Sequence, residues 1–257
     1  MSGVPSHLPY PWGSFSMTTA PAGPQARSPY AAPDVKGLRL RAPVGLAIAL
    51  TVLFALVIGV DIFAVYTDWN LRVLMERLLA DPAVSGAELH HGYLLTGRAG
   101  MFQGQAAIVT GIVFIVWFHR VRTNAEVFAP GRDKLARGWA IGAWFIPLAN
   151  MLLPYRIAVT TWSSSIPLGA DGGYRRFPLT LVNLWWGIFI LSKLVGWYGR
   201  QTYVRAESAE AARDAATTML VGDLLDITAA VLAVLFVRRL TAMQHARASQ
   251  GPVVAAV

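Results

Sequence analysis

Residues 43–66 read PVGLAIALTVLFALVIGVDIFAVY, an apolar run whose one charged side chain is Asp61. A helix needs about 20 residues to cross a hydrocarbon core of about 30 Å. Pro43 opens the run, where a helix tolerates proline because its first backbone amides have no partner within the helix. The stretch therefore predicts a transmembrane helix, and with it an all-α integral membrane protein.

Three more stretches meet the same criterion of length and apolarity. They are GMFQGQAAIVTGIVFIVWF (residues 100–118), LTLVNLWWGIFILSKLVGWYG (residues 179–199) and TTMLVGDLLDITAAVLAVLFV (residues 217–237). Only 14% of all residues are charged, against about 25% in an average soluble domain. We therefore expect a helical transmembrane domain over residues 43–240, between tails at 1–42 and 241–257.

A fifth apolar stretch, residues 138–162, contains Pro147 and Pro154. Because each proline removes a backbone donor and kinks or breaks a helix, the segment either crosses as a kinked span or returns to the side it entered from. If the segment returns, 15 Lys and Arg residues lie on the side of the termini and 6 lie on the other side. If it crosses, 12 lie on one side of the membrane and 9 on the other. Since Lys and Arg accumulate on cytoplasmic loops, the count favours return, four full spans and cytoplasmic termini.

The net charge of +8 would suit nucleic acid, but the basic residues gather at the ends of the spans, as orientation in a membrane requires. We therefore expect a multi-pass protein of a bacterial plasma membrane that contacts lipids and binds no nucleic acid. The chain has no cysteine, and the adjacent His90 and His91 cannot face one metal ion from one helix. Neither a metal nor another cofactor is expected.

Segments outside the spans carry weaker signals. The proline-rich residues 1–42 predict a disordered spacer, or alternatively a docking tail for a protein partner in the membrane or the cytoplasm. Leu71 and Leu74 begin an apolar stripe in residues 68–82, which predicts a short amphipathic helix on the outer face of the bundle or in the headgroups. Ser85 and Glu88 match a capping box, so the second long helix should begin well before the membrane.

Ionisable side chains within the spans are the candidate functional residues, because each is costly in a bilayer unless it is paired or hydrated. They are Asp61, Lys193, Asp223 and Asp226. In the hairpin of the last two spans, Lys193, Asp223 and Asp226 fall at similar depth, at about 1.5 Å of rise per residue. Two interpretations stay open: a structural Lys–Asp clamp, or a polar vestibule for an ion, a proton or a polar solute.

Two intramembrane enzyme motifs that would use these acids are broken. Ile227 and Val231 stand where a CDP-alcohol phosphotransferase needs glycine and arginine, and Leu220 stands where an intramembrane aspartyl protease needs glycine. We therefore expect no enzyme and no catalytic residue. The GxxxG pairs Gly100/Gly104 and Gly138/Gly142 could bring helices close together, so a homo-oligomer stays open.

One bipartite motif is distinctive: WFHRVRTN (residues 117–124), then WAIGAWFIPLANMLLP (residues 139–154). It resembles the bacterial, mostly actinobacterial, domain of unknown function family 4328, whose members are multi-span membrane proteins. The matching residues are Trp117, Arg120, Asn124, Trp139, Trp144, Phe145, Pro147, Asn150, Pro154 and Trp162. The resemblance implies the membrane fold and the broken segment, but no activity. Family members often have an acidic residue just before the last tryptophan, whereas this chain has Thr161 there.

These observations favour a non-enzymatic scaffold, sensor or accessory subunit that works through protein or lipid contacts. The alternative is a small transporter or channel that uses the broken segment and the Lys/Asp cluster, since broken helices form solute sites in transporters. Asn150 lies between the two prolines, so we expect it to pack inside the bundle and to bond the carbonyls that they leave free.

Overall fold

A computed structural model describes residues 40–81, 83–169 and 178–250. The predicted tails therefore lie largely outside the described residues, at 1–39 and 251–257. The helices are α1 (Val44–Ala80), α2 (Gly86–Phe128), α3 (Trp139–Gly142), α4 (Ala149–Ser164), α5 (Thr180–Val204) and α6 (Ala209–Ser249). Four of them, α1, α2, α5 and α6, are long and apolar enough to cross a membrane, which confirms the predicted fold class.

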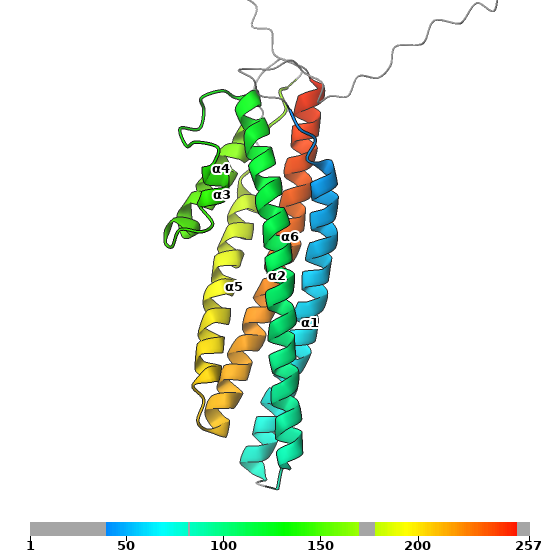
Figure 1. The fold of residues 1–257 in the computed structure, drawn as a ribbon, viewed down its shortest axis with the longest axis vertical. Coiled ribbons are helices and arrows are strands. Elements are labelled where there is room, and N and C mark those ends of the chain that lie inside the picture. The colour runs from blue at the N-terminus through cyan, green and yellow to red at the C-terminus, as the bar shows by residue number, and fades with distance from the viewer. Residues whose placement is uncertain (1–39, 82, 170–177, 251–257) are drawn as a thin grey trace, which may run out of the picture.

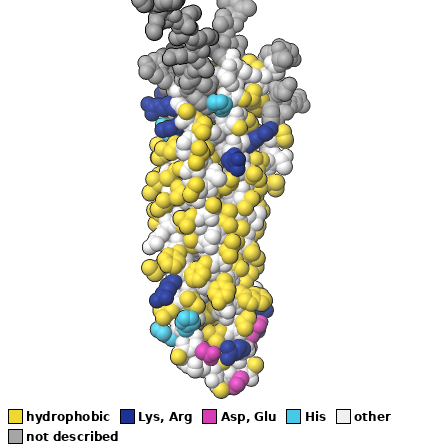
Figure 2. Space-filling model, turned by 90° about the vertical axis from the view of Figure 1, so that its right-hand side faces the viewer, with side chains coloured by type: hydrophobic (Ala, Val, Ile, Leu, Met, Phe, Trp, Pro, Cys, Tyr) yellow, Lys and Arg dark blue, Asp and Glu magenta, His cyan; other side chains and the backbone are white. Residues whose placement is uncertain are grey.

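The four long helices run side by side along the long axis of the molecule (Figure 1). They pack in the order α5, α6, α1, α2, while α2 and α5 hardly touch. The start of α1 and the end of α6 lie at the same end of the bundle. Figure 2 shows apolar side chains over the middle of one face, with charged side chains gathered towards both ends. This distribution is the one that a bilayer requires.

The broken segment forms a short hairpin, α3 and α4, beside the upper part of the bundle (Figure 1). Between the two helices Leu148 has a φ of 64°, in the left-handed region that a leucine rarely adopts. The chain leaves α2 and enters α5 at the same end, so the hairpin does not run the length of the bundle. The helices long and apolar enough to span a membrane number four among the described residues.

The expectation that Asn150 packs inside the bundle is wrong, because its side chain is exposed. Backbone amides serve the turn instead: the N–H of Asn150 donates to the carbonyl of Ile146 over 3.0 Å, and that of Ala149 to Pro147 over 2.8 Å. The side-chain amide is therefore not needed to satisfy the break.

The expected amphipathic helix on the outer face is also wrong. Residues 67–80 contain no glycine or proline, so α1 continues through them without interruption to Ala80. Leu71, Leu74 and Met75 of this extension are buried and pack against Ala212 and Ala216 of α6. The apolar stripe thus prolongs the bundle. The predicted start of α2 is confirmed, since the Ser85 hydroxyl accepts a hydrogen bond from the Glu88 N–H.

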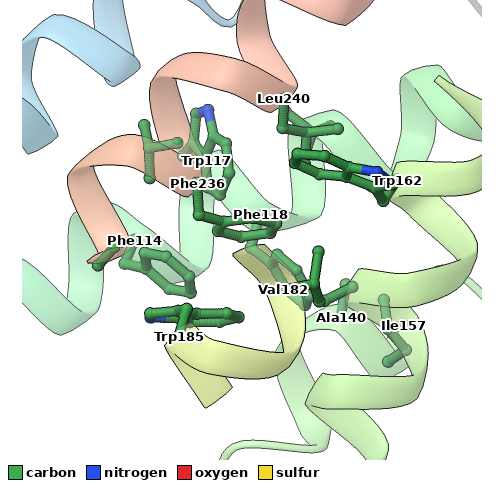
Figure 3. Close-up of a cluster of buried hydrophobic side chains, with 14 of the residues drawn as sticks. Phe114, Trp117, Phe118, Ala140, Ile157, Trp162, Val182, Trp185, Phe236 and Leu240 are labelled. Carbon is green, nitrogen blue, oxygen red and sulfur yellow. The ribbon is translucent and has the colours of Figure 1, made fainter. Parts of the chain in front are cut away.

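An aromatic core holds the upper half of the bundle together (Figure 3). The rings of Phe236 on α6 and Trp185 on α5 stack with centroids 4.5 Å apart, and Trp162 on α4 stacks with the same phenylalanine at 6.0 Å. Trp144, from the break, contacts Phe114 of α2 edge-on at 5.6 Å. Such pairs contribute about 0.5–1.5 kcal/mol each beyond their buried area. The core therefore fastens the hairpin to α2, α5 and α6.

Glycine lets α5 and α6 approach closely in the lower half. A Cβ atom on Gly222 would lie 3.1 Å from the Cα of Gly196, and one on Gly199 would lie 3.0 Å from the backbone nitrogen of Met219. Neither predicted GxxxG pair, Gly100/Gly104 or Gly138/Gly142, has any atom within 4 Å of such a Cβ. Among the described residues these pairs therefore show no close helix approach like that at Gly222, and the homo-oligomer stays a prediction.

Candidate functional site

The four candidate ionisable residues fall into two groups. Lys193 on α5 donates a hydrogen bond of 2.6 Å to Asp226 on α6, which also accepts one of 2.8 Å from the hydroxyl of Ser192. The predicted pairing of Lys193 with an acid of the last span is thereby confirmed for Asp226. Asp223 belongs to the second group.

The second group is built around Gln103 of α2. Its side-chain nitrogen donates to Asp61 of α1 over 3.0 Å and to Asp223 of α6 over 2.8 Å. A further acid of α1, Asp68, lies with Gln103 and Asp223 around the same cavity. We call Asp61, Asp68, Gln103 and Asp223 the carboxylate cluster. It joins three of the four long helices.

The cluster borders a cavity of about 200 Å³ to which α5 also contributes. Its polar lining residues are Asp68, Thr96, Gln103, Arg200, Tyr203 and Asp223. All four long helices therefore meet around one polar space. No residue of the α3–α4 hairpin lines it.

Several oxygen atoms of this region are buried and have no hydrogen-bond partner within the protein. They are Oδ2 of Asp61, Oδ2 of Asp68 and Oγ1 of Thr96, in side chains that are 4% or less exposed. Leaving a buried polar group unsatisfied costs about 1–3 kcal/mol. Because Asp68 and Thr96 line the cavity, their free oxygens are available to a proton, a water molecule or a small polar ligand.

Sequence reasoning missed Asp68, Thr96 and Arg200 as members of the site. The signal for Asp68 was present: it follows Asp61 by seven residues, about two helical turns, and so lies on the same helix face. That signal was hidden by the assumption that the first helix ends near residue 66. The exposed Arg200 and the buried Thr96 carry no such local signal, since only the packing of α2 against its neighbours brings them to the cavity.

A metal centre lacks the required ligands in the part of the chain that the structure describes. Within residues 40–81, 83–169 and 178–250, no three His, Asp or Glu side chains are placed to hold a metal ion. The chemistry that the carboxylate cluster offers is therefore that of exchangeable protons and hydrogen bonds.

The first half of the bipartite motif forms a polar cap at the upper end of the bundle. The Asn124 side chain exchanges two hydrogen bonds with the backbone of Arg41 and donates a third, of 3.0 Å, to Gln244 of α6. The indole N–H of Trp117 donates to Thr241, and Arg120 donates to the carbonyl of Ala42. These residues tie the segment before α1 to α2 and α6.

The second half of the motif shapes the hairpin. Trp144 lies in the aromatic core and Pro154 is buried within α4. Phe145 is 71% exposed, and Pro147 and Asn150 are exposed as well. The structure brings none of the motif residues to the carboxylate cluster, whereas Trp144 lines a second cavity together with Lys193 and Asp226.

A family model described as a domain of unknown function (DUF4328) matches residues 80–242. This range contains the whole bipartite motif, Gln103, Lys193, Asp223 and Asp226, whereas Asp61 and Asp68 of α1 precede it. No curated protein and no solved structure matches the chain.

Proposed function

The chain belongs to the family of the domain of unknown function DUF4328, and from this premise and the geometry of the cluster we propose that it is a non-enzymatic membrane sensor. Its input is the uptake and release of a proton by the carboxylate cluster. The observation that carries the proposal is that the side-chain amide of Gln103 donates to the carboxyl groups of both Asp61 on α1 and Asp223 on α6. Asp68 of α1 lines the same cavity as Asp223.

Carboxyl groups gathered around one side chain repel one another when all are charged, and a bound proton relieves this repulsion. Two full negative charges 4 Å apart repel by about 4 kcal/mol at an effective dielectric constant of about 20. Loss of the proton therefore favours separation of α1 from α6 at this level. The surrounding charged and titratable groups are Asp61 on α1, Arg200, Tyr203 and Lys193 on α5, and Asp226 on α6, while α2 contributes the uncharged Thr96 and Gln103.

The continuity of α6 supports a second part of the proposal, that a movement at the cluster reaches the polar cap. This helix runs unbroken from Asp223 to Gln244, roughly 30 Å at 1.5 Å per residue. Gln244 is fully buried and holds Asn124 in the polar cap. A shift of α6 against α1 at the cluster is therefore passed along a rigid element to the segment that precedes α1.

The transporter alternative has less support. It was based on the broken segment together with the Lys/Asp cluster. Trp144 of that segment lines a cavity with Lys193 and Asp226, but no residue of the hairpin lines the cavity beside the carboxylate cluster. A proton site without a second structural element to open and close it fits a sensor better than a carrier.

The test measures the separation of α1 and α6 as a function of pH. Spin labels at the exposed Ala80 and Glu210 of the full chain in lipid nanodiscs report this distance. We expect the distance distribution to broaden as the pH rises, and the response to disappear in the double variant Asp68→Asn, Asp223→Asn. The matched control is Asp214→Asn, an exposed acid of α6 paired with Arg213, which should respond as the unmodified protein does. An equal pH response in all three proteins would refute the proposal, and pH-driven proton flux in proteoliposomes would replace it with transport.

A further inference from the structure

A second cavity, of about 290 Å³, lies between the four long helices and is separate from the carboxylate cluster. Its walls are almost entirely apolar and include Phe54, Gly111, Phe114, Trp185, Phe189 and Ala230. Trp144 of the hairpin and the Lys193–Asp226 pair also line it. In contrast to the first cavity, it offers little to a polar ligand.

This cavity opens sideways. α2 and α5 both line it, but their backbones hardly approach one another. Phe114 of α2 and Trp185 of α5 are in ring contact, with centroids 5.8 Å apart, and the hairpin lies beside the upper end (Figure 1). Ala107 on α2 and Lys193 on α5 line the cavity and are themselves exposed. The neighbouring side chains Ile108 and Leu194 are 65% and 52% exposed, so the opening is continuous with the apolar outer surface.

The membrane around the opening determines which molecules can enter the cavity. The opening lies within the apolar stretches of α2 and α5, where a membrane presents hydrocarbon. An apolar cavity holds no stable water but binds apolar molecules, as engineered protein cavities do. Left empty, its lining atoms would lose their dispersion contacts on one side. Hydrocarbon chains are the apolar molecules present at this depth.

We propose that this cavity is a binding site for one acyl chain of a membrane phospholipid, which enters between α2 and α5. The acyl chain lies among the aromatic residues Phe114 and Trp185 and the small residues Gly111, Ala229 and Ala230, all of which line the cavity. This site is independent of the proton sensor proposed above, because the two cavities share no lining residue.

The experiment uses the full chain in nanodiscs that contain a phosphatidylcholine with a photoreactive diazirine on its acyl chain. After irradiation, mass spectrometry maps the labelled residues. We expect labels on cavity residues such as Ala107, Ile115 and Ala230 in addition to those on outward-facing side chains such as Ile108.

The decisive variant is Gly111→Leu, which fills the cavity. A Cβ at Gly111 has no atom within 4 Å, so the first carbon of the added side chain meets no neighbour. The matched control is Gly187→Leu on α5, where the surroundings are equally open but the residue lines neither cavity. Labelling of the cavity residues should fall several-fold in Gly111→Leu and stay unchanged in Gly187→Leu, with labelling of Ile108 constant in both.

A second variant guards against misfolding. Ala107→Trp places a large ring at the opening, and it should reduce labelling of Ala230 without changing that of Ile108. Labelling that is equal over the cavity and the outer surface, or that persists in the cavity of both variants, would overturn the proposal.

Discussion

The ammonium nitrogen of Lys193 on α5 lies 2.6 Å from a carboxylate oxygen of Asp226 on α6. Asp223, one turn earlier on α6, instead accepts a hydrogen bond from Gln103 and lines a cavity together with Asp68. The two acids of the last span therefore have different partners and different roles. One closes an ion pair between neighbouring helices, and the other belongs to the cluster that joins α1, α2 and α6.

Replacing Lys193 by Met should destabilise the bundle, because Asp226 is only 16% exposed and would lose its counter-charge. Adding Asp226→Asn should restore much of the loss, giving an interaction energy of about 0.5–3 kcal/mol in a double-mutant cycle. Unfolding in mixed detergent micelles measures it. The same cycle with Asp223→Asn should be nearly additive, and equal coupling to both acids would show that the ion pair is not specific.

Asn124→Leu should destabilise the polar cap. The change removes three hydrogen bonds, two to the backbone of Arg41 and one to Gln244, and leaves buried partners unsatisfied at about 1–3 kcal/mol. Unfolding in detergent gives the loss of stability, and limited proteolysis should show faster cleavage beside Arg41. Protection at Arg41 equal to that of the unmodified protein would mean that Asn124 does not hold this segment.

Asn150→Leu should leave stability within about 0.5 kcal/mol of the unmodified protein, as is usual for exposed positions. This side chain is exposed and the break is satisfied by backbone amides. The same unfolding experiment measures it and makes it the matched control for Asn124→Leu. A loss comparable to that of Asn124→Leu would show that Asn150 does support the break.

Gly222→Ala should separate α5 from α6, because the added Cβ would lie 3.1 Å from the Cα of Gly196, and backbone cannot yield as a flexible side chain can. We expect a lower unfolding temperature. Gly104→Ala on α2 has open space around it and should be neutral or stabilising by about 0.5–1 kcal/mol, the usual gain of alanine over glycine in a helix. Equal effects of the two changes would argue against the close approach.

The orientation of the bundle is testable with fusions to a reporter that is active only in the cytoplasm. Fusions after Val257 and within the 163–178 loop should both be active, because both termini and this loop are expected on the cytoplasmic side. A fusion between Ala83 and Ser85, in the connection from α1 to α2, should be inactive. The opposite pattern would invert the orientation, and the same result at all three positions would mean that the hairpin crosses.

The sequence by itself determined the features that depend on neighbouring residues. Run length and apolarity identified the four long helices, and Pro147 marked the break. The rise per residue placed Lys193 level with the acids of α6, because depth along a helix is a local property. Ser85 indicated the start of α2, because a capping side chain accepts a hydrogen bond from the backbone N–H three residues later.

Only the tertiary structure decided which side chains meet. Asp68 lies near Asp223 because α1 continues beyond the span and packs against α6. Asn150 is exposed, and backbone hydrogen bonds close the turn beside it. The arrangement α5, α6, α1, α2 depends on contacts between residues far apart in the chain, such as Gly196 with Gly222. Helix period and hydropathy say how deep a residue lies in the membrane, but the neighbour it faces is set by how closely whole helices can pack.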